Sequence, residues 1–489
     1  MKKTASILIL ILLLCCPAGL AENAAEDLPF RSLPGTTCYP VFTEGTGELG
    51  GHFMIDCPMD WDAKDVSTAY GLPMVMAVDP ENYAHMIMIA EIGPAIRANI
   101  LEDESHPVSG FVSDGLEVIR GKSTDHSRIL EEYVLNDLPA VRVEMTGQGF
   151  EMIWVSDPDG DDPGTLWFFM YPADPEDEEY TRLIGDIADS FTVFFPKSVG
   201  ETPEEMFGYT ITDGEAVITA YTGDRRYVIV PSVLGGCPVT AMAGEGFYET
   251  SVKCVAFPDS IRALDGSLFG GCTELVAVRL PADLTELPAA AFESCMRLMD
   301  PGLNEGLVSI GPGAFWGNFY LMDLALPDTL TGIADNNFVM CNFLYRFTVS
   351  DRCEGFRTDR DGMILYSRDG ERLLKYSFLL DDDAFTVPDG VKKIDAYCFS
   401  RASLTDISLP ESLEEIGVGA FAWSGVTVLT VPQGVTRLGV MQAVNADGDP
   451  VTGSTLIGNS LKVIRGVPGS PAEEYAERFG LTFEPVGQE

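Results

Sequence analysis

The side chains with the greatest potential for chemistry lie in the first 200 residues of this 489-residue chain. All four histidines are there, namely His52, His85, His106 and His126. The tripeptide Asp125-His126-Ser127 has the residue types of a hydrolase triad. A triad is a spatial arrangement, however, and residues adjacent in sequence cannot form such a proton relay. The sequence also contains no nucleophile elbow, phosphate-binding loop or zinc-binding histidine pair. We therefore predict no enzymatic activity, and an enzyme with its site in the N-terminal part is the alternative.

An aspartate-rich turn over residues 157–164 is the second chemical candidate. Its carboxylates would suit a hard cation such as Ca²⁺, and they belong to Asp157, Asp159, Asp161 and Asp162. Gly160 comes two positions too early for an EF-hand loop, and Phe168 stands where the bidentate glutamate belongs. Aspartate, glycine and proline also dominate ordinary turns. The pattern favours a hairpin turn over a calcium site, and we expect no metal and no other cofactor.

The composition restricts the partners. The chain has 31 Lys and Arg against 75 Asp and Glu, a net charge of −44. Binding to phosphate backbones requires many basic side chains, so nucleic acid is excluded as a main partner. The same charge disfavours docking on anionic lipid. Hydrophobic residues make up 46% of the chain, which is enough for packed cores. The length indicates more than one domain.

Residues 1–21 have the pattern of a signal peptide. Lys2 and Lys3 precede an apolar run, residues 7–14, that is too short to span a bilayer, and Ala21 ends a small-residue cleavage site. Cleavage there removes two bases and no acid, which takes the net charge from −44 to −46. A lipoprotein is the alternative, but Leu14 or Cys15 stands where a lipobox needs a small residue. We predict a secreted or cell-surface protein with no membrane span in the mature chain.

A repeat of 22 or 23 residues begins near residue 250. Its marker is a phenylalanine, found at Phe247, Phe269, Phe292, Phe315 and Phe338 and again at Phe399 and Phe421. Each unit starts with a short apolar strand that ends at a proline slot, and two further apolar residues precede the phenylalanine. One unit cannot close its own core, so the units must stack. The predicted fold is a β-rich solenoid of short parallel strands.

The units LVAVRLPADLTELPAAAFESC at 275–295 and LTDISLPESLEEIGVGAFAWS at 404–424 resemble the BspA-type leucine-rich repeat family. The resemblance covers about residues 205–485. It implies repeats over 205–460, an inserted hairpin over 361–376 with its turn at Asp369-Gly370, and a strand–helix–strand cap over 461–485. In the cap, Ser470 and Glu473 should form a capping box, and Gly480 should end the helix. The family resemblance also implies surface-associated interaction.

Residues 28–197 lack the repeat and are predicted to form an α+β domain. We expect strands over 52–58, 74–80 and 85–92, a hairpin around 157–164, and helices over 111–120 and 175–194. This order resembles the PsbP-like fold over about residues 45–195. The motifs that carry the resemblance span residues 53–61, 135–143 and 189–193. They imply an architecture and no reaction.

The cysteines fall into two groups. Cys272, Cys295 and Cys341 each follow a marker phenylalanine by three residues, and we interpret them as a buried column of small side chains. A metal site is disfavoured because close CxxC pairs are absent. Cys38 and Cys57 are the only cysteines between the signal peptide and the repeats, and we predict a disulfide between them.

The strand face of the solenoid is the remaining candidate for function, because solenoids use such faces to bind other proteins. Outward positions lie two and four residues before each proline slot. The polar side chains among them are Arg279, Asp300, Asp323, Arg346, Thr348, Asp406, Ser408 and Thr430. We predict an exported, non-catalytic protein that recognises a protein or cell-surface ligand through this face. A passive structural protein of the cell envelope is a further alternative.

Overall fold

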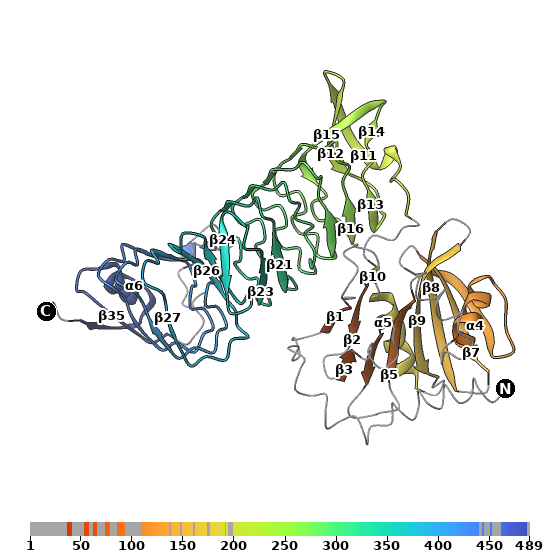
Figure 1. The fold of residues 1–489 in the computed structure, drawn as a ribbon, viewed down its shortest axis with the longest axis horizontal. Helices are drawn as coiled ribbons and strands as arrows, with labels where there is room; N and C mark the ends of the chain where they lie inside the picture. Colours follow the sequence, from red (N-terminus) through yellow and green to blue (C-terminus); the bar gives the residue numbers. More distant parts are fainter. Residues whose placement is uncertain are drawn as a thin grey trace. The chain divides into compact units, whose positions relative to one another are not determined.

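The structure is a computed structural model of the whole chain (Figure 1). It describes residues 109–135, 138–146, 149–159, 162–173, 177–190, 199–439 and 461–486, together with isolated strand segments before and between them. The chain divides into two compact units, Met1–Gly200 and Glu201–Glu489. The predicted signal peptide lies outside the described residues. Within the described ranges, no helix is both long and apolar enough to cross a membrane.

The N-terminal unit contains a seven-stranded antiparallel sheet in the order β3-β4-β5-β9-β8-β7-β6 and a smaller sheet, β1-β2-β10. The elements are β1 Thr37–Val41, β2 Phe53–Cys57, β3 Asp62–Asp65, β4 Met74–Val78, β5 Met86–Ile92, α4 Ser109–Ile119, β6 Ser127–Leu135, β7 Leu138–Met145, β8 Phe150–Asp159, β9 Asp162–Pro172, α5 Glu178–Ser190 and β10 Thr192–Val193. The closing helix is shorter than predicted, because the chain enters strand β10 at Thr192.

Both faces of the large sheet are covered. Along β8, Ile153 and Val155 belong to the core that contains Ile184 of α5. The alternate residue Trp154 belongs to a second core, on the side of α4. Gly115 of α4 lies so close to the Trp154 indole that a Cβ atom would come within 2.3 Å of the ring. This close approach requires glycine, and the unit is an α+β domain with one helix on each face of its sheet.

The second unit opens with a 3₁₀ turn and a small sheet, and then coils into the solenoid. The opening elements are η1 Glu204–Met206, β11 Phe207–Thr212, β12 Glu215–Tyr221, β14 Val233–Leu234 and β15 Cys237–Gly246. Strands β11 and β12 are antiparallel, whereas β12 pairs with β15 in the parallel sense. From there onward the coils contribute short strands to two rows (Figure 1), each of which is divided into several small sheets.

The first strand row contains the strands that precede the proline slots. They are β13 Tyr227–Ile229, β16 Cys254–Ala256, β18 Ala277–Arg279, β21 Asp323–Leu326, β23 Arg346–Val349, β27 Ala384–Thr386, β29 Asp406–Ser408, β31 Val428–Thr430, β35 Val463–Gly466 and β36 Thr482–Pro485. The second strand row follows each slot. It consists of β17 Ala263–Leu264, β19 Glu286–Leu287, β20 Ser309–Ile310, β22 Gly332–Ile333, β28 Lys393–Ile394, β30 Glu415–Ile416 and β32 Arg437–Leu438. Pairing within both rows is parallel, one repeat to the next.

The marker phenylalanines stack through the solenoid core. Phe247, Phe269, Phe292, Phe315 and Phe338 have successive ring-centroid distances of 5.2, 5.4, 5.7 and 6.4 Å. After an interruption, Phe399 and Phe421 stack at 5.3 Å with their planes within 3°. The period in the sequence is therefore the period of the stack. Each ring closes its own coil and supports the next one.

Every phenylalanine turn also has a residue in the left-handed backbone conformation, two positions after the ring. The φ angles at these positions lie between 55° and 75°. The residues are Glu249, Gly271, Ser294, Gly317, Met340, Arg401 and Trp423. This conformation turns the chain out of the core. Glycine adopts it without steric cost, whereas other residues pay for it.

An inserted segment interrupts both rows between β23 and β27. It forms β24 Phe356–Asp359, β25 Ile364–Ser367 and β26 Arg372–Tyr376, with antiparallel pairing and a turn at Asp369-Gly370. Strand β26 then pairs in parallel with β28 and thereby begins the second half of the second row. Leu365 and Leu374 pack with the core of the preceding repeats, while Ile364 and Leu373 pack with the core that follows. The insert thus separates two hydrophobic cores and packs against both of them.

The chain adds a short pair of strands, β33 Ala443–Val444 and β34 Pro450–Val451, and then the terminal cap. In the cap, helix α6 Pro471–Phe479 lies between the parallel strands β35 and β36, and Gly480 ends the helix at φ 65°. The predicted capping box is wrong in both halves. Ser470 makes no side-chain cap hydrogen bond. The Glu473 carboxylate instead accepts from the amide of Gly469, one residue earlier, at 2.6 Å.

Candidate functional site

The tripeptide Asp125-His126-Ser127 does not form a relay. Its serine begins β6 and is 2% exposed, with its hydroxyl directed at the Met145 sulfur at 3.6 Å. The backbone amide of His126 donates to the Thr124 hydroxyl at 3.2 Å, as in a turn. The other three histidines lie outside the described residues.

The aspartate-rich segment is a hairpin between β8 and β9, with Asp159 opposite Asp162. Asp157 is 5% exposed within β8. The side chains of Asp159, Asp161 and Asp162 lie outside the described part, so a calcium site there stays a prediction. Among the described side chains, no group of three acidic, histidine or cysteine residues is placed to hold a metal.

The predicted strand-face residues are distributed over several short sheets of the first strand row. Arg279, Arg346, Thr348, Asp406, Ser408 and Thr430 are exposed, and Asp300 and Asp323 are half-buried. The smaller outward positions at the start of the row differ from expectation. Cys254, Ala256 and Ala277 are 2%, 8% and 0% exposed. Asp300 has no strand around it and accepts a hydrogen bond from the amide of Gly302 at 2.9 Å.

The structure brings three of the eight residues together. Arg346 on β23 lies directly across from Asp323 on β21, with an Nε–Oδ2 distance of 2.5 Å. The Thr348 hydroxyl donates to the other oxygen of Asp323 at 3.3 Å. The hydrogen bond to Asp323 raises the pKa of the Arg346 guanidinium. These three side chains form a neutralised polar group in the middle of the face.

The inserted segment divides this face into two parts. The amide of Phe347 on β23 bonds to the Gly362 carbonyl of the insert rather than to a repeat strand. Arg360 and Asp382 then pair at 2.6 Å beside the insert. Asp406, Ser408 and Thr430 lie beyond it, and their side chains make no hydrogen bond with a described residue. Sequence spacing alone predicted one continuous strip.

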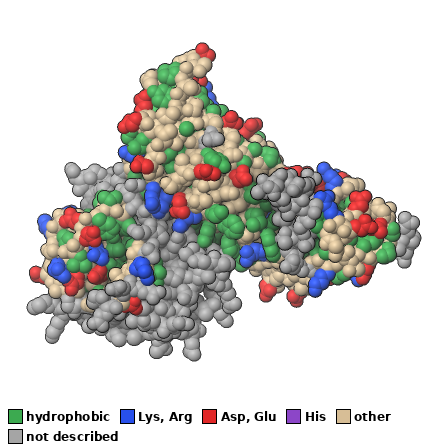
Figure 2. Space-filling model, turned by 180° about the vertical axis from the view of Figure 1, so that it is seen from behind, with side chains coloured by type: hydrophobic (Ala, Val, Ile, Leu, Met, Phe, Trp, Pro, Cys, Tyr) green, Lys and Arg blue, Asp and Glu red, His purple; other side chains and the backbone are tan. Residues whose placement is uncertain are grey.

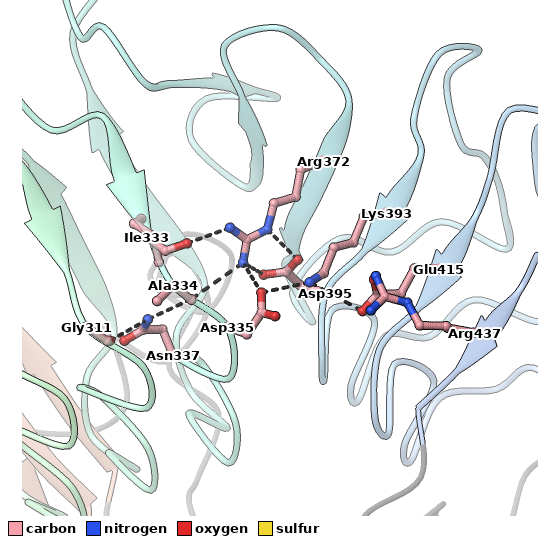
Figure 3. A network of polar contacts seen from close by, with 10 residues as sticks. All are labelled: Gly311, Ile333, Ala334, Asp335, Asn337, Arg372, Lys393, Asp395, Glu415 and Arg437. Carbon is pink, nitrogen blue, oxygen red and sulfur yellow. Dashed lines mark hydrogen bonds and ion pairs between the residues drawn. The ribbon is translucent and has the colours of Figure 1, made fainter.

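An ion-pair network on the second strand row was not predicted (Figure 3). Arg372 of β26 contacts Asp395 with Nε–Oδ1 and Nη2–Oδ2 distances of 2.6 Å, and also reaches Asp335 at 3.2 Å. Lys393 pairs with Asp335 at 2.7 Å and with Glu415 at 3.3 Å. Arg437 continues the series by pairing with Glu415. Four adjacent strands are therefore linked by alternating charges.

The environments of the two aspartates differ. Burial raises the pKa of Asp395, and this effect exceeds the opposing effect of Arg372. Burial also tends to raise the pKa of Asp335, but the hydrogen bond and charge of Lys393, with the charge of Arg372, hold this pKa below its usual value.

The residues that pair in this network are separated by 22 to 58 positions in sequence. No local pattern joins residues so far apart across an insert.

The cysteine column has a hydrogen-bonding role beyond packing. The thiols of Cys272, Cys295 and Cys341 each donate to the carbonyl of the marker phenylalanine in the preceding repeat, at 2.9, 3.0 and 2.9 Å. Asn318 occupies the same position in the repeat between them, and its amide donates to the Phe292 carbonyl at 2.8 Å. Burial raises the pKa of all three thiols. A donor is needed here because the carbonyl is buried.

The predicted Cys38–Cys57 disulfide stays a prediction. Strands β1 and β2 are antiparallel neighbours, with Cys38 opposite Asp56 and Thr37 opposite Cys57. The two cysteines are thus one register position apart, and their side chains lie outside the described part. Seven other cysteines are free, six of them buried.

The described surface of the solenoid carries both signs of charge. Figure 2 shows acidic and basic side chains interspersed on the face that it presents.

Comparison with known proteins identifies the repeats. The profile of the BspA-type leucine-rich repeat region matches six copies over residues 240–359 and 378–442, on either side of the inserted hairpin. No curated protein matches the chain.

Several solved bacterial structures are similar to part of this chain. A leucine-rich repeat protein of T. pallidum is 26% identical over 46% of this chain and 89% of its own, with a TM-score of 0.31. The pneumococcal vaccine antigen PcpA is 20% identical over 54% and 82%, with a TM-score of 0.40. A leucine-rich cell-surface protein of Faecalibacterium prausnitzii is 20% identical over 60% and 96%, with a TM-score of 0.35. On their repeat sequence, residues 240–359 and 378–442 of this chain form a BspA-type leucine-rich repeat region.

Proposed function

We propose that this chain is an exported, non-catalytic binding protein that recognises a protein or cell-surface ligand through the first strand row of its solenoid. The main support for this proposal is the polar group Asp323–Arg346–Thr348. It lies on the first strand row, and the Arg346 guanidinium is exposed. Arg346 presents its remaining N–H donors to solvent, while Asp323 holds the guanidinium at 2.5 Å and accepts a hydrogen bond from the Thr348 hydroxyl. A fixed guanidinium loses little freedom when a ligand carboxylate or carbonyl binds it.

The family supports binding rather than catalysis, because solenoids of this kind present extended surfaces to partners. Export is supported by the sequence of residues 1–21 alone. The proposed ligand acts on the exposed part of the row, and the buried positions Cys254, Ala256 and Ala277 do not take part.

The test is a binding screen of the mature chain against extracellular-matrix proteins and purified bacterial envelope fractions. A saturable ligand is expected, and Arg346→Ala with Thr348→Ala should weaken it. The matched control is Thr331→Ala, an exposed threonine that immediately precedes strand β22 of the second strand row. A ligand that binds the double variant as well as the wild type would place recognition elsewhere. If the screen gave no saturable partner, the result would favour the alternative that the chain is a passive structural protein of the cell envelope.

A further inference from the structure

The left-handed position after each marker phenylalanine holds different kinds of residue in different repeats. It is glycine at Gly271 and Gly317, which suits the conformation. In the last three phenylalanine turns it is Met340, Arg401 and Trp423, at φ 60°, 65° and 56°. Bulky side chains in this region of backbone space are strained, and such strain concentrates at functional sites. The fold itself is satisfied by glycine here, so the large side chains need another explanation.

Two of these side chains reach solvent in adjacent turns. The amide of Arg401 donates to the carbonyl of Ala422 at 2.9 Å, which places Arg401 beside Trp423 on the ridge of the turns. The Trp423 side chain is 45% exposed. Its ring lies 6.1 Å from that of Tyr397. The Arg401 guanidinium lies 5.4 Å above the ring of Phe343, in the preceding turn.

The apolar residues of this ridge are separate from the solenoid cores. Val339, Ala396, Tyr397 and Ala422 form a small cluster of their own, and partly buried side chains pack against it. The latter include Trp316, Met340 and Val418. Because the two main cores close without this cluster, the exposed Trp423 ring is not required to complete them.

Arg401 is available to a ligand. Its guanidinium makes no ion pair and no hydrogen bond with any described side chain, and it lies over the Phe343 ring. Tryptophan, tyrosine, methionine and arginine are the residues enriched at the centres of protein interfaces, where they contribute most of the binding free energy.

We propose that this turn ridge is a docking surface for another polypeptide. It consists of the exposed Arg401 and Trp423 and the half-buried Met340 and Phe343, and the buried Tyr397 supports the Trp423 ring. The partner presents a carboxylate to Arg401 and an apolar side chain to Trp423. A guanidinium held over an aromatic ring fits a carboxylate flanked by apolar groups. This surface lies on the phenylalanine turns rather than on either strand row, so it is a second site that does not depend on the proposed function of the strand face.

The test uses the full mature chain and a displayed library of random linear dodecapeptides. Selected peptides should contain Asp or Glu beside an aromatic or aliphatic residue. Calorimetry with the synthetic peptides should show a loss of about tenfold or more in affinity for Trp423→Gly and for Arg401→Gln. Arg401→Lys keeps the charge and should retain part of the affinity.

Two controls separate recognition from folding. Trp423→Gly installs the residue that Gly317 already provides at this position, so the variant should melt no lower than the wild type. Glu249→Gly makes the same backbone change in a distant turn and should leave peptide affinity unchanged. The strand-face variant Arg346→Ala should also bind the peptides normally. If Arg346→Ala abolished peptide binding while Trp423→Gly and Arg401→Gln did not, the ridge proposal would be wrong and the strand face would be the binding site.

Other outcomes overturn the proposal directly. A melting temperature of Trp423→Gly well below that of the wild type would make the ridge a packing feature. A library that yields no peptide sensitive to Trp423→Gly would have the same meaning. Binding of maltohexaose or polygalacturonate that quenches Trp423 fluorescence, in the absence of peptide binding, would assign the ridge to a saccharide instead.

Discussion

Arg372 and Asp395 form a two-point ion pair, with both nitrogen–oxygen distances at 2.6 Å, at the place where the insert interrupts the second strand row. The remaining nitrogen of Arg372, Nη1, donates to the carbonyl of Ile333 at 2.5 Å. Strand β22 has no following strand at this point, since β26 pairs only with β25 and β28. The arginine side chain therefore satisfies a carbonyl that a backbone amide satisfies in the uninterrupted repeats.

Loss of this arginine should destabilise the solenoid strongly. Arg372→Met leaves the nearly buried Asp395 without its partner, and removal of one member of a buried pair costs about 3–5 kcal/mol. Urea unfolding followed by circular dichroism measures the change. Arg437→Met is the matched control, because that side chain is 73% exposed in its pair with Glu415 and should change stability by about 1 kcal/mol or less.

The double variant Arg372→Met with Asp395→Leu removes both charges and should recover part of the lost stability. If Arg372→Met were no more harmful than Arg437→Met, the network would be a surface feature without a structural role. That result would also remove the explanation for the Ile333 carbonyl.

Lys375 should give the solenoid a measurable pH dependence. It lies in β26 at 4% exposure, donates to the Tyr397 carbonyl at 3.0 Å, and has its pKa lowered by burial. Between that lowered pKa and the unfolded value of about 10.4, the unfolded chain binds more protons, so rising pH stabilises the folded state. The stability difference between wild type and Lys375→Met should therefore shift in favour of the wild type as pH rises toward 10.4.

Lys392→Met is the control for this titration. The hydrogen bond and charge of Glu371 raise the pKa of Lys392, so its contribution is lost as pH rises. The difference between wild type and this variant should stay constant up to about pH 10.4 and should then shift in the opposite direction as pH rises through the raised pKa. Parallel shifts for the two variants would contradict the assigned environments.

Asn318 should be replaceable by the cysteine of the neighbouring repeats. Its amide nitrogen bonds to the Phe292 carbonyl, but its buried Oδ1 has no partner. Asn318→Cys keeps a donor and removes the unpaired acceptor, so it should be neutral or stabilising by about 1 kcal/mol. Asn318→Ala leaves the carbonyl without its side-chain donor and should cost about 1–3 kcal/mol. Thermal unfolding distinguishes them, and equal loss in both variants would show that only side-chain volume matters.

Thiol labelling should separate the cysteines by burial. In the folded protein, Cys237 is half-buried, whereas Cys254, Cys272, Cys295, Cys341, Cys353 and Cys398 are buried. Burial also raises the pKa of Cys272, Cys295, Cys341 and Cys398, which further lowers their thiolate fraction. Brief treatment with iodoacetamide followed by peptide mass spectrometry should modify Cys237 first among these seven. Rapid modification of Cys295 in the folded chain would contradict the buried column.

The same digest tests the predicted disulfide. A Cys38–Cys57 bond would protect both residues from alkylation until a reductant is added. Labelling of either residue without reduction would show that the pair is not bonded.

The sequence predicted the solenoid well because each repeat is defined by residues that lie close together in the chain. Phe292 and Phe315 stack in the structure at the spacing that their separation of 23 residues implies. Gly480 ended the cap helix as predicted, since its left-handed conformation is a property of one residue and its neighbours. The capping box predicted by the same local reasoning does not form. The Glu473 carboxylate accepts from the amide of Gly469, and the Ser470 hydroxyl makes no cap hydrogen bond.

The outward strand positions show which features of the strand face a local sequence pattern can predict and which it cannot. The pattern placed Arg346 and Asp323 on one face, and the parallel register brought them together. It also predicted a continuous strip, which the insert divides at Gly362. A periodic pattern carries no information about how an aperiodic segment will sit between its copies.

The sequence by itself determined the repeat, its strands, its stacked rings and the absence of recognised catalytic motifs, because each of these depends on residues within one unit and its neighbour. The tertiary structure alone decided how Arg372 bridges the insert, why Asn318 and Cys295 share a column, and which side chains form the ridge around Trp423. These depend on the packing of coils against each other and around an irregular segment, where partners 22 or more residues apart meet only after the chain has folded.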